Sequence, residues 1–136
     1  MTKYLRWRDL EDVQKEFCLD PDSGICNGCG GSGSWFNPPD YIFKQACHEH
    51  DFAYWVGGSS SQKKLADAEF RVNMRLAIKQ AIKVRNIAWY KVWWYKGACW
   101  RYFKSVTTFG RKYFNNTDVP KTITDLQTLM REKGFN

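Results

Sequence analysis

A histidine followed directly by an aspartate, His50-Asp51, is the pair of residues in this chain whose types and spacing best suit catalysis. An imidazole accepts a proton near neutral pH, and a carboxylate binds hard cations. Neighbouring residues of an α-helix point about 100° apart, so the two side chains can border one cleft while facing different targets. Cys47 and Tyr54 share a helical face with His50. The pattern predicts a helical site in which His50 takes a proton from water while Asp51 holds a cation.

A second acid, Asp67, is predicted to reach this site from the following helix. Asp67 begins an otherwise apolar helical stripe that continues with Phe70, Met74, Ala77 and Ala81. An acid on an inward face needs a partner, and a histidine on an antiparallel neighbour is a natural one. Such a carboxylate fixes the tautomer of the imidazole and stabilises its cation. The simpler alternative is a surface ion pair between Asp67 and Arg71, one helical turn later.

Two long helices with a short connection are predicted to carry these residues. The first follows Pro39, covers residues 40 to about 55, and ends at the glycines and serines of residues 57–61. The second is expected to begin at about residue 62 with Ser61 as its cap, and to reach at least residue 85. A short connection between long helices implies antiparallel neighbours.

The remainder of the chain is expected to add shorter helices at both ends. Apolar residues at helical spacing predict a helix within residues 7–17, and a last helix is expected over residues 121–133. Residues 86–114 are rich in aromatic and basic residues, with breaks expected at Gly97 and Gly110.

A glycine-rich segment precedes the histidine and completes a recognisable motif. Its glycines have the spacing Gly-x-Gly-Gly-x-Gly at Gly28, Gly30, Gly31 and Gly33. Pro39 lies eleven residues before His50, Cys47 three before it, and Tyr54 three after Asp51. This pattern resembles the core of the phospholipase A2 superfamily, and with Ala66-Asp67 it is similar to the shorter bacterial and parvoviral capsid versions. The resemblance covers roughly residues 26–74.

The chain departs from the family pattern at three places. About four extra residues separate the glycines from Pro39, Ala46 stands where a second cysteine is usual, and Cys26 replaces the usual loop tyrosine.

The resemblance implies a mainly α-helical, phospholipase A2-like fold, in which two antiparallel helices carry the His-Asp site behind a glycine-rich calcium loop. It implies calcium-dependent hydrolysis of a phospholipid acyl ester at the sn-2 position. In that reaction His50 is the general base, Asp67 orients it, and Tyr54 hydrogen-bonds Asp67. The implied Ca²⁺ ligands are the carboxylate of Asp51 and the backbone carbonyls of Cys26, Gly28 and Gly30.

A zinc site is an alternative reading of overlapping residues. Cys26-x-x-Cys29 is half of a zinc site, and Cys47, His48 and His50 are candidate ligands for the other half. On one helix, however, His48 points away from the other two. In this alternative the protein is a non-enzymatic binding module whose basic aromatic region contacts nucleic acid.

The length of 136 residues predicts a single domain, residues 1–136. Its core is expected at about residues 26–85, followed by a basic, aromatic-rich extension over about 86–136. Five cysteines leave at least one unpaired within the chain, and a bridge from Cys26 or Cys29 to Cys47 is allowed.

The net charge of +7 is concentrated in one part of the chain. Residues 70–117 contain eleven Lys and Arg and no acid. Trp and Tyr favour the lipid headgroup level, and cations attract anionic headgroups. We therefore expect an anionic phospholipid membrane as partner, with no specific nucleic acid, bound through Trp89, Trp93, Trp94, Trp100, Lys91, Lys96, Arg101 and Lys104. The alternative is that these tryptophans belong to the core.

No apolar run approaches the roughly 20 residues needed to cross a bilayer. The first eight residues contain neither an apolar run nor a small-residue cleavage site, so no signal peptide is expected. We therefore expect a cytosolic protein, a virion component, or a protein delivered without a signal peptide.

Overall fold

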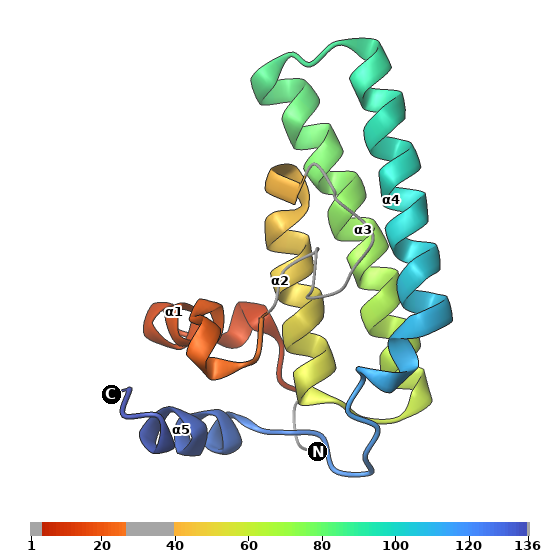
Figure 1. Cartoon of the computed structure of the whole chain (residues 1–136). Helices are drawn as coiled ribbons and strands as arrows, with labels where there is room; N and C mark the ends of the chain where they lie inside the picture. Colours follow the sequence, from red (N-terminus) through yellow and green to blue (C-terminus); the bar gives the residue numbers. More distant parts are fainter. Residues whose placement is uncertain (1–3, 27–39, 136) are drawn as a thin grey trace.

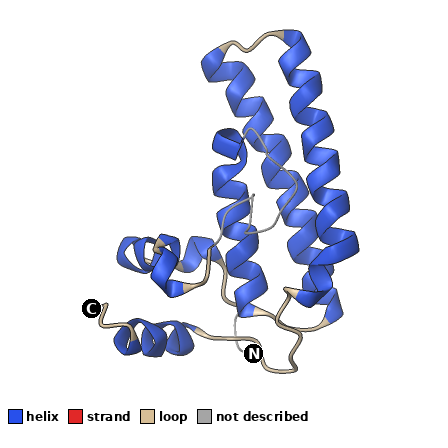
Figure 2. Cartoon of the chain, viewed as in Figure 1, coloured by secondary structure: helices blue, strands red, loops and turns tan. Residues whose placement is uncertain are grey.

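The computed structural model describes residues 4–26 and 40–135. Within these ranges the protein is mainly α-helical, with five α-helices, three short 3₁₀ turns and no sheet (Figures 1 and 2). The α-helices are α1 (Asp12–Leu19), α2 (Asp40–Val56), α3 (Ser60–Arg85), α4 (Trp89–Phe109) and α5 (Ile123–Glu132). The 3₁₀ turns are η1 (Trp7–Asp9), η2 (Pro21–Ser23) and η3 (Gly110–Lys112). The predicted mainly helical class is confirmed at this level.

The three long helices form an antiparallel arrangement in which α3 packs against both α2 and α4 (Figure 1). The turn from α2 into α3 depends on Gly57 and Gly58, whose φ angles of 77° and 134° suit glycine. The amide of Gly58 donates to the carbonyl of Asn115 at 3.0 Å, and Thr117 donates to the carbonyl of Gly58 at 3.0 Å. The chain that follows α4 is therefore tied back to the α2–α3 turn.

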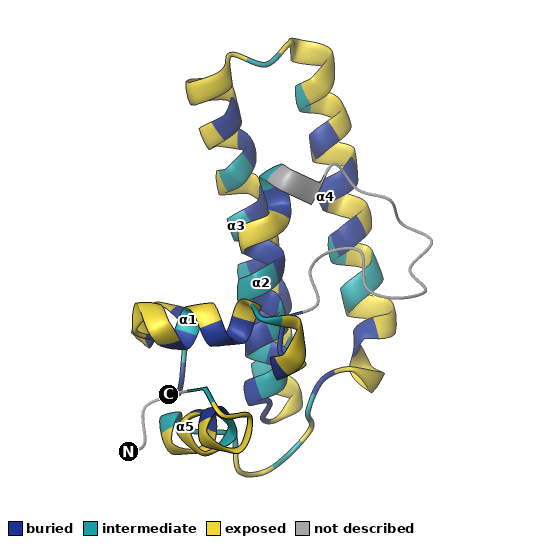
Figure 3. Ribbon diagram, turned by 60° about the vertical axis from the view of Figure 1, so that its left-hand side comes forward, coloured by how far each residue is buried: buried dark blue, intermediate teal, exposed yellow. Residues whose placement is uncertain are grey.

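Helix α2 is covered on two sides by separate apolar clusters, which Figure 3 shows as buried ribbon. On one side, Phe52 and Val56 pack with residues of α1 and α5, including Phe17 and Leu126. On the other side, α2 packs with α3 and α4 in a cluster that includes Phe43, Phe70, Met74, Tyr95 and Tyr102. Burial on both sides fixes the rotation of α2 about its axis, and with it the direction of its polar side chains.

Several predicted boundaries are wrong in detail. Helix α3 begins at Ser60 with Ser59 at its N-cap position, so Ser61 is not the cap. Helix α4 continues through Gly97 and ends before Gly110, so only the second expected break exists. The predicted helix over residues 7–17 is instead η1 followed by α1.

Candidate functional site

His50 and Asp67 are hydrogen-bonded inside the helical bundle, as the antiparallel pairing of α2 and α3 predicts. The Nε2 atom of His50 lies 2.9 Å from Oδ1 of Asp67. His50 is 7% exposed and Asp67 is 2% exposed. Because Nε2 is engaged by the carboxylate, Nδ1 is the imidazole nitrogen that is left to take a proton from water.

Two further side chains hold the Asp67 carboxylate. The hydroxyl of Tyr54 donates to Oδ1 at 2.6 Å, so the predicted contact between Tyr54 and Asp67 is present. The ammonium of Lys63 donates to Oδ2 at 2.7 Å and also to the backbone carbonyl of Val106 at 3.1 Å. Lys63 therefore joins the carboxylate on α3 to the backbone of α4.

Sequence reasoning missed Lys63, although its position four residues before Asp67 was a usable signal. The alternative that Asp67 pairs with Arg71 on the surface is wrong. Asp67 is buried, and the guanidinium of Arg71 lies 5.2 Å from the ring centroid of Phe103. Side chains of an α-helix lean toward its N-terminus, so Asp67 leans toward Lys63 and away from Arg71.

The charge states of the pair follow from burial and hydrogen bonding. Burial lowers the pKa of His50 below its ordinary value, and the bond from Asp67 opposes this only in part. Burial acts to raise the pKa of Asp67, but the hydrogen bonds from His50, Lys63 and Tyr54 together lower it. The site at neutral pH therefore contains a neutral imidazole and an ionised carboxylate.

Aromatic rings fix the orientation of the imidazole. The ring of Phe70 is stacked on His50, with centroids 4.3 Å apart and planes 25° from parallel. The ring of Tyr54 lies 4.2 Å from the imidazole on centroids. Gly110 lies against the Tyr54 hydroxyl so closely that a Cβ atom at this position would collide with it. This close approach places the phenol between Asp67 and the end of α4.

Asp51, the predicted calcium ligand, is half-buried on α2. Burial is the main cause of the raised pKa of the Cys26 thiol, and the negative charge of Asp51 is the second. The Cys26 thiol also donates to the carbonyl of His48 at 3.4 Å. The predicted carboxylate ligand therefore interacts electrostatically with the first residue of the predicted loop.

The oxygen donors fit a hard cation such as calcium, since a carboxylate and backbone carbonyls are its preferred ligands. Of the predicted ligands, Asp51 and Cys26 are described, whereas Gly28 and Gly30 lie outside the described residues.

The described residues do not form the alternative zinc set. Cys26 is a free thiol with a raised pKa, Cys47 is disulfide-bonded, and His50 is engaged by Asp67. Zinc binds cysteine as a thiolate. Neither the protonated thiol of Cys26 nor the disulfide-bonded sulfur of Cys47 is a thiolate. Among the described residues, no three or more His, Cys, Asp or Glu side chains form a group able to hold a metal. Because Cys26 is free, the bridge from Cys26 to Cys47 is wrong; Cys29 lies outside the described residues.

The tryptophans of α4 lie on the surface, so their assignment to the core is wrong. Trp89, Trp93, Trp94 and Trp100 are 75%, 68%, 52% and 60% exposed. The residues of α4 that face the bundle are instead Tyr95, Ala98, Cys99 and Tyr102. The four predicted cations, Lys91, Lys96, Arg101 and Lys104, are also exposed. Across residues 4–26 and 40–135, no helix is both long enough and apolar enough to span a bilayer.

Comparison with known proteins identified no matching family model, no matching curated protein and no matching solved structure.

Proposed function

We propose that this protein has a phospholipase A2-like fold and hydrolyses an acyl ester of a phospholipid in a calcium-dependent reaction. The observation that carries the proposal is the buried hydrogen bond between His50 and Asp67, which follows the spacing of the superfamily motif. The hydrogen bond from Tyr54 to Asp67 and the electrostatic interaction between Asp51 and Cys26 also support it. A buried imidazole held by a carboxylate is a general base with a fixed tautomer.

In the proposed reaction, Nδ1 of His50 takes a proton from a water molecule as the water oxygen bonds to the ester carbonyl carbon. The carbon–oxygen bond to the lysophospholipid then breaks, and His50 returns the proton to the departing oxygen. Asp67 stabilises the imidazolium that exists between these steps, because its buried carboxylate accepts from Nε2. Phe70 and Tyr54 hold the ring in place, so little reorganisation is needed when the proton moves.

Lys63 keeps the second oxygen of Asp67 occupied and the carboxylate ionised. Calcium, when bound by Asp51 and by the carbonyls of Cys26, Gly28 and Gly30, supplies positive charge that polarises the ester carbonyl.

The test compares the two adjacent histidines with a dispersed, monomeric phospholipid ester as substrate. His50→Gln should lower kcat/KM by about 10²–10⁴-fold, the usual contribution of a general base. His48→Gln is the matched control, since this half-buried histidine makes no described contact with Asp67, and it should retain nearly full activity. Chelation of calcium should abolish wild-type hydrolysis.

The same assay addresses Asp67. Asp67→Asn should lower kcat by less than His50→Gln does, with calcium affinity unchanged, because Asp67 neither bonds to the substrate nor holds the cation. Equal activity of the two histidine variants, or hydrolysis that survives chelation, would contradict the proposal.

A further inference from the structure

The second half of the chain is rich in exposed cations. All eleven Lys and Arg between Phe70 and Thr117 are exposed, and no acid occurs in that stretch. These residues lie on α3, α4 and η3. Of these elements only α3 contains acids, Asp67 and Glu69, and both precede this stretch. Each is already paired with another cation, Lys63 and Arg6 respectively.

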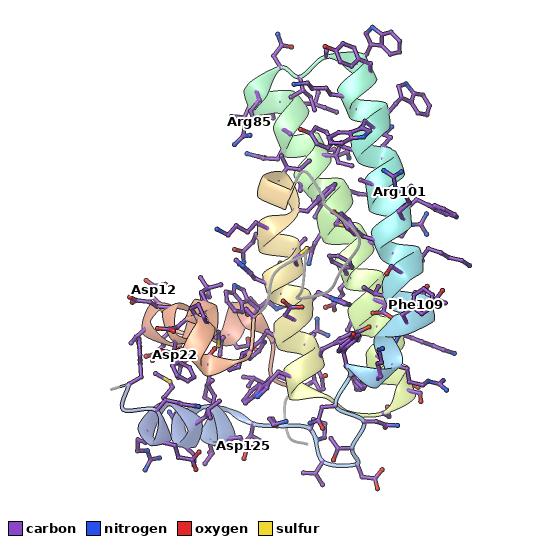
Figure 4. All side chains as sticks on the ribbon, viewed as in Figure 1. Asp12, Asp22, Arg85, Arg101, Phe109 and Asp125 are labelled. Carbon is purple, nitrogen blue, oxygen red and sulfur yellow. The ribbon has the colours of Figure 1, made fainter. Side chains whose placement is uncertain are left out.

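Aromatic residues lie among these cations on one side of α4, which we name the α4 outer face. It consists of Trp89, Trp93, Lys96, Trp100, Arg101 and Lys104, which fall within about 140° of arc on a helical wheel and are all exposed. The opposite side of the helix contains Tyr95, Ala98 and Tyr102, which are buried against the bundle. Figure 4 shows Arg101 and Phe109 on the side of α4 that faces away from α2.

The placement of the tryptophans is unusual for a helix that has a packed core on its other side. Tryptophan is highly buried on average, yet three on this face are at least 60% exposed. The ammonium of Lys96 lies 5.4 Å from the ring centroid of Trp93, so a cation and an indole are presented together. An indole beside an ammonium suits the boundary between headgroups and acyl chains.

We infer that the α4 outer face binds the surface of an anionic lipid bilayer, independently of any hydrolysis. Its charge complements anionic headgroups, and its indoles can enter the interface. From Trp89 to Lys104 the face is about 22 Å long on the outward side of one helix, which suits an extended flat partner. A second copy of this chain is disfavoured, because two such cationic faces repel each other.

Single-stranded nucleic acid also attracts cations and aromatics, but it is usually held in a groove. The α4 outer face is instead the outward side of a single helix, which favours the bilayer.

The test is vesicle co-sedimentation in the presence of a chelator, so that neither calcium-dependent hydrolysis nor calcium bridging contributes. Binding should be strong to vesicles that contain phosphatidylglycerol, weak to phosphatidylcholine alone, and weakened by added salt. Each cation near an anionic surface contributes about fivefold to partitioning. The triple variant Lys96→Gln, Arg101→Gln, Lys104→Gln should therefore bind on the order of 100-fold more weakly.

A matched control separates the effect of the α4 outer face on vesicle binding from the effect of the total net charge. The variant Arg8→Gln, Arg131→Gln, Lys133→Gln removes the same three charges from exposed positions outside α3 and α4, and it should lose much less. Replacement of Trp93 and Trp100 by alanine should weaken binding with little change in its salt dependence.

The wild-type indole fluorescence should be quenched by brominated lipid. Equal losses in the two charge variants, tighter binding to single-stranded DNA than to anionic vesicles, or self-association through the α4 outer face would each overturn the inference. Because the assay requires no turnover, its failure is distinct from failure of the proposed hydrolysis.

Discussion

Replacement of Asp67 by asparagine should destabilise the protein by removing the charge that compensates Lys63. Asp67 is 2% exposed and its carboxylate accepts from His50, Tyr54 and Lys63. Breaking a buried ion pair by removing one partner costs about 3–5 kcal/mol. The amide keeps one acceptor oxygen, and the Lys63 side chain is 13% exposed, so we expect the lower end, about 3 kcal/mol.

The coupling between the two residues is measured with a double-mutant cycle. Lys63→Met keeps the length of the side chain and should cost about 2 kcal/mol, because His50 and Tyr54 still bond to Asp67. Once Asp67 is neutral, the cation has lost its partner. The double variant should therefore be only about as unstable as Asp67→Asn alone, which gives a coupling energy of about 2 kcal/mol.

Urea unfolding followed by circular dichroism gives the four free energies, and thermal unfolding provides a check. For a chain of this length, 3 kcal/mol corresponds to a decrease in Tm of roughly 10–15 °C. If the destabilisation of the double variant equals the sum of the two single losses within about 0.5 kcal/mol, the two sites are independent. That result would refute the coupling between Asp67 and Lys63.

The stabilities of wild type and Asp67→Asn should also depend differently on pH in the acid range. The pKa of Asp67 is held below its ordinary value of 3.8 by its hydrogen bonds, so the native state favours the ionised form. That contribution is complete above the ordinary value and is lost as the pH falls through the lowered native pKa. The stability difference between wild type and Asp67→Asn should shrink over this interval. A difference that grows with falling pH would contradict the sign of the shift.

Two further predictions address the cation site and the packing around Tyr54. Asp51→Asn should abolish calcium binding in calorimetry with little change in Tm, whereas Glu49→Gln, two residues away and bonded to Asn73, should keep it; equal affinities of wild type and Asp51→Asn would contradict the ligand assignment. Gly110→Ala should cost about 1–3 kcal/mol, because the new methyl group meets the Tyr54 hydroxyl. In contrast, Gly97→Ala should stabilise α4 by about 0.5–1 kcal/mol, because apart from the adjacent residues and the local helix backbone no atom lies within 4 Å of its Cβ position.

The sequence by itself determined the helices and the meeting of His50 with Asp67. Apolar residues at helical spacing define the inward faces, and the short connection through Gly57 makes the two helices antiparallel. Two polar residues on the inward faces of adjacent antiparallel helices tend to bond to each other, because a buried polar group without a partner is costly. Local sequence was a poorer guide to exact ends, since consecutive serines are equally able to cap a helix.

Tertiary packing decided what local preference left open. Gly97 did not interrupt α4, because the neighbouring residues Tyr95, Ala98 and Cys99 pack against α3 and outweigh the cost of one glycine. The ammonium of Lys63 is also held by the backbone carbonyl of Val106 on α4. Nothing in the sequence near Asp67 indicates this contact, because Val106 comes from a different helix.

The aromatic residues of α4 show the same division. Composition alone does not distinguish tyrosines from tryptophans as core residues, since this helix contains both. Packing against α3 buried the tyrosines at 95 and 102 and left the tryptophans outside. The physical reason is that burial depends on which side of a helix meets a neighbour, and that rotation is set by the whole bundle.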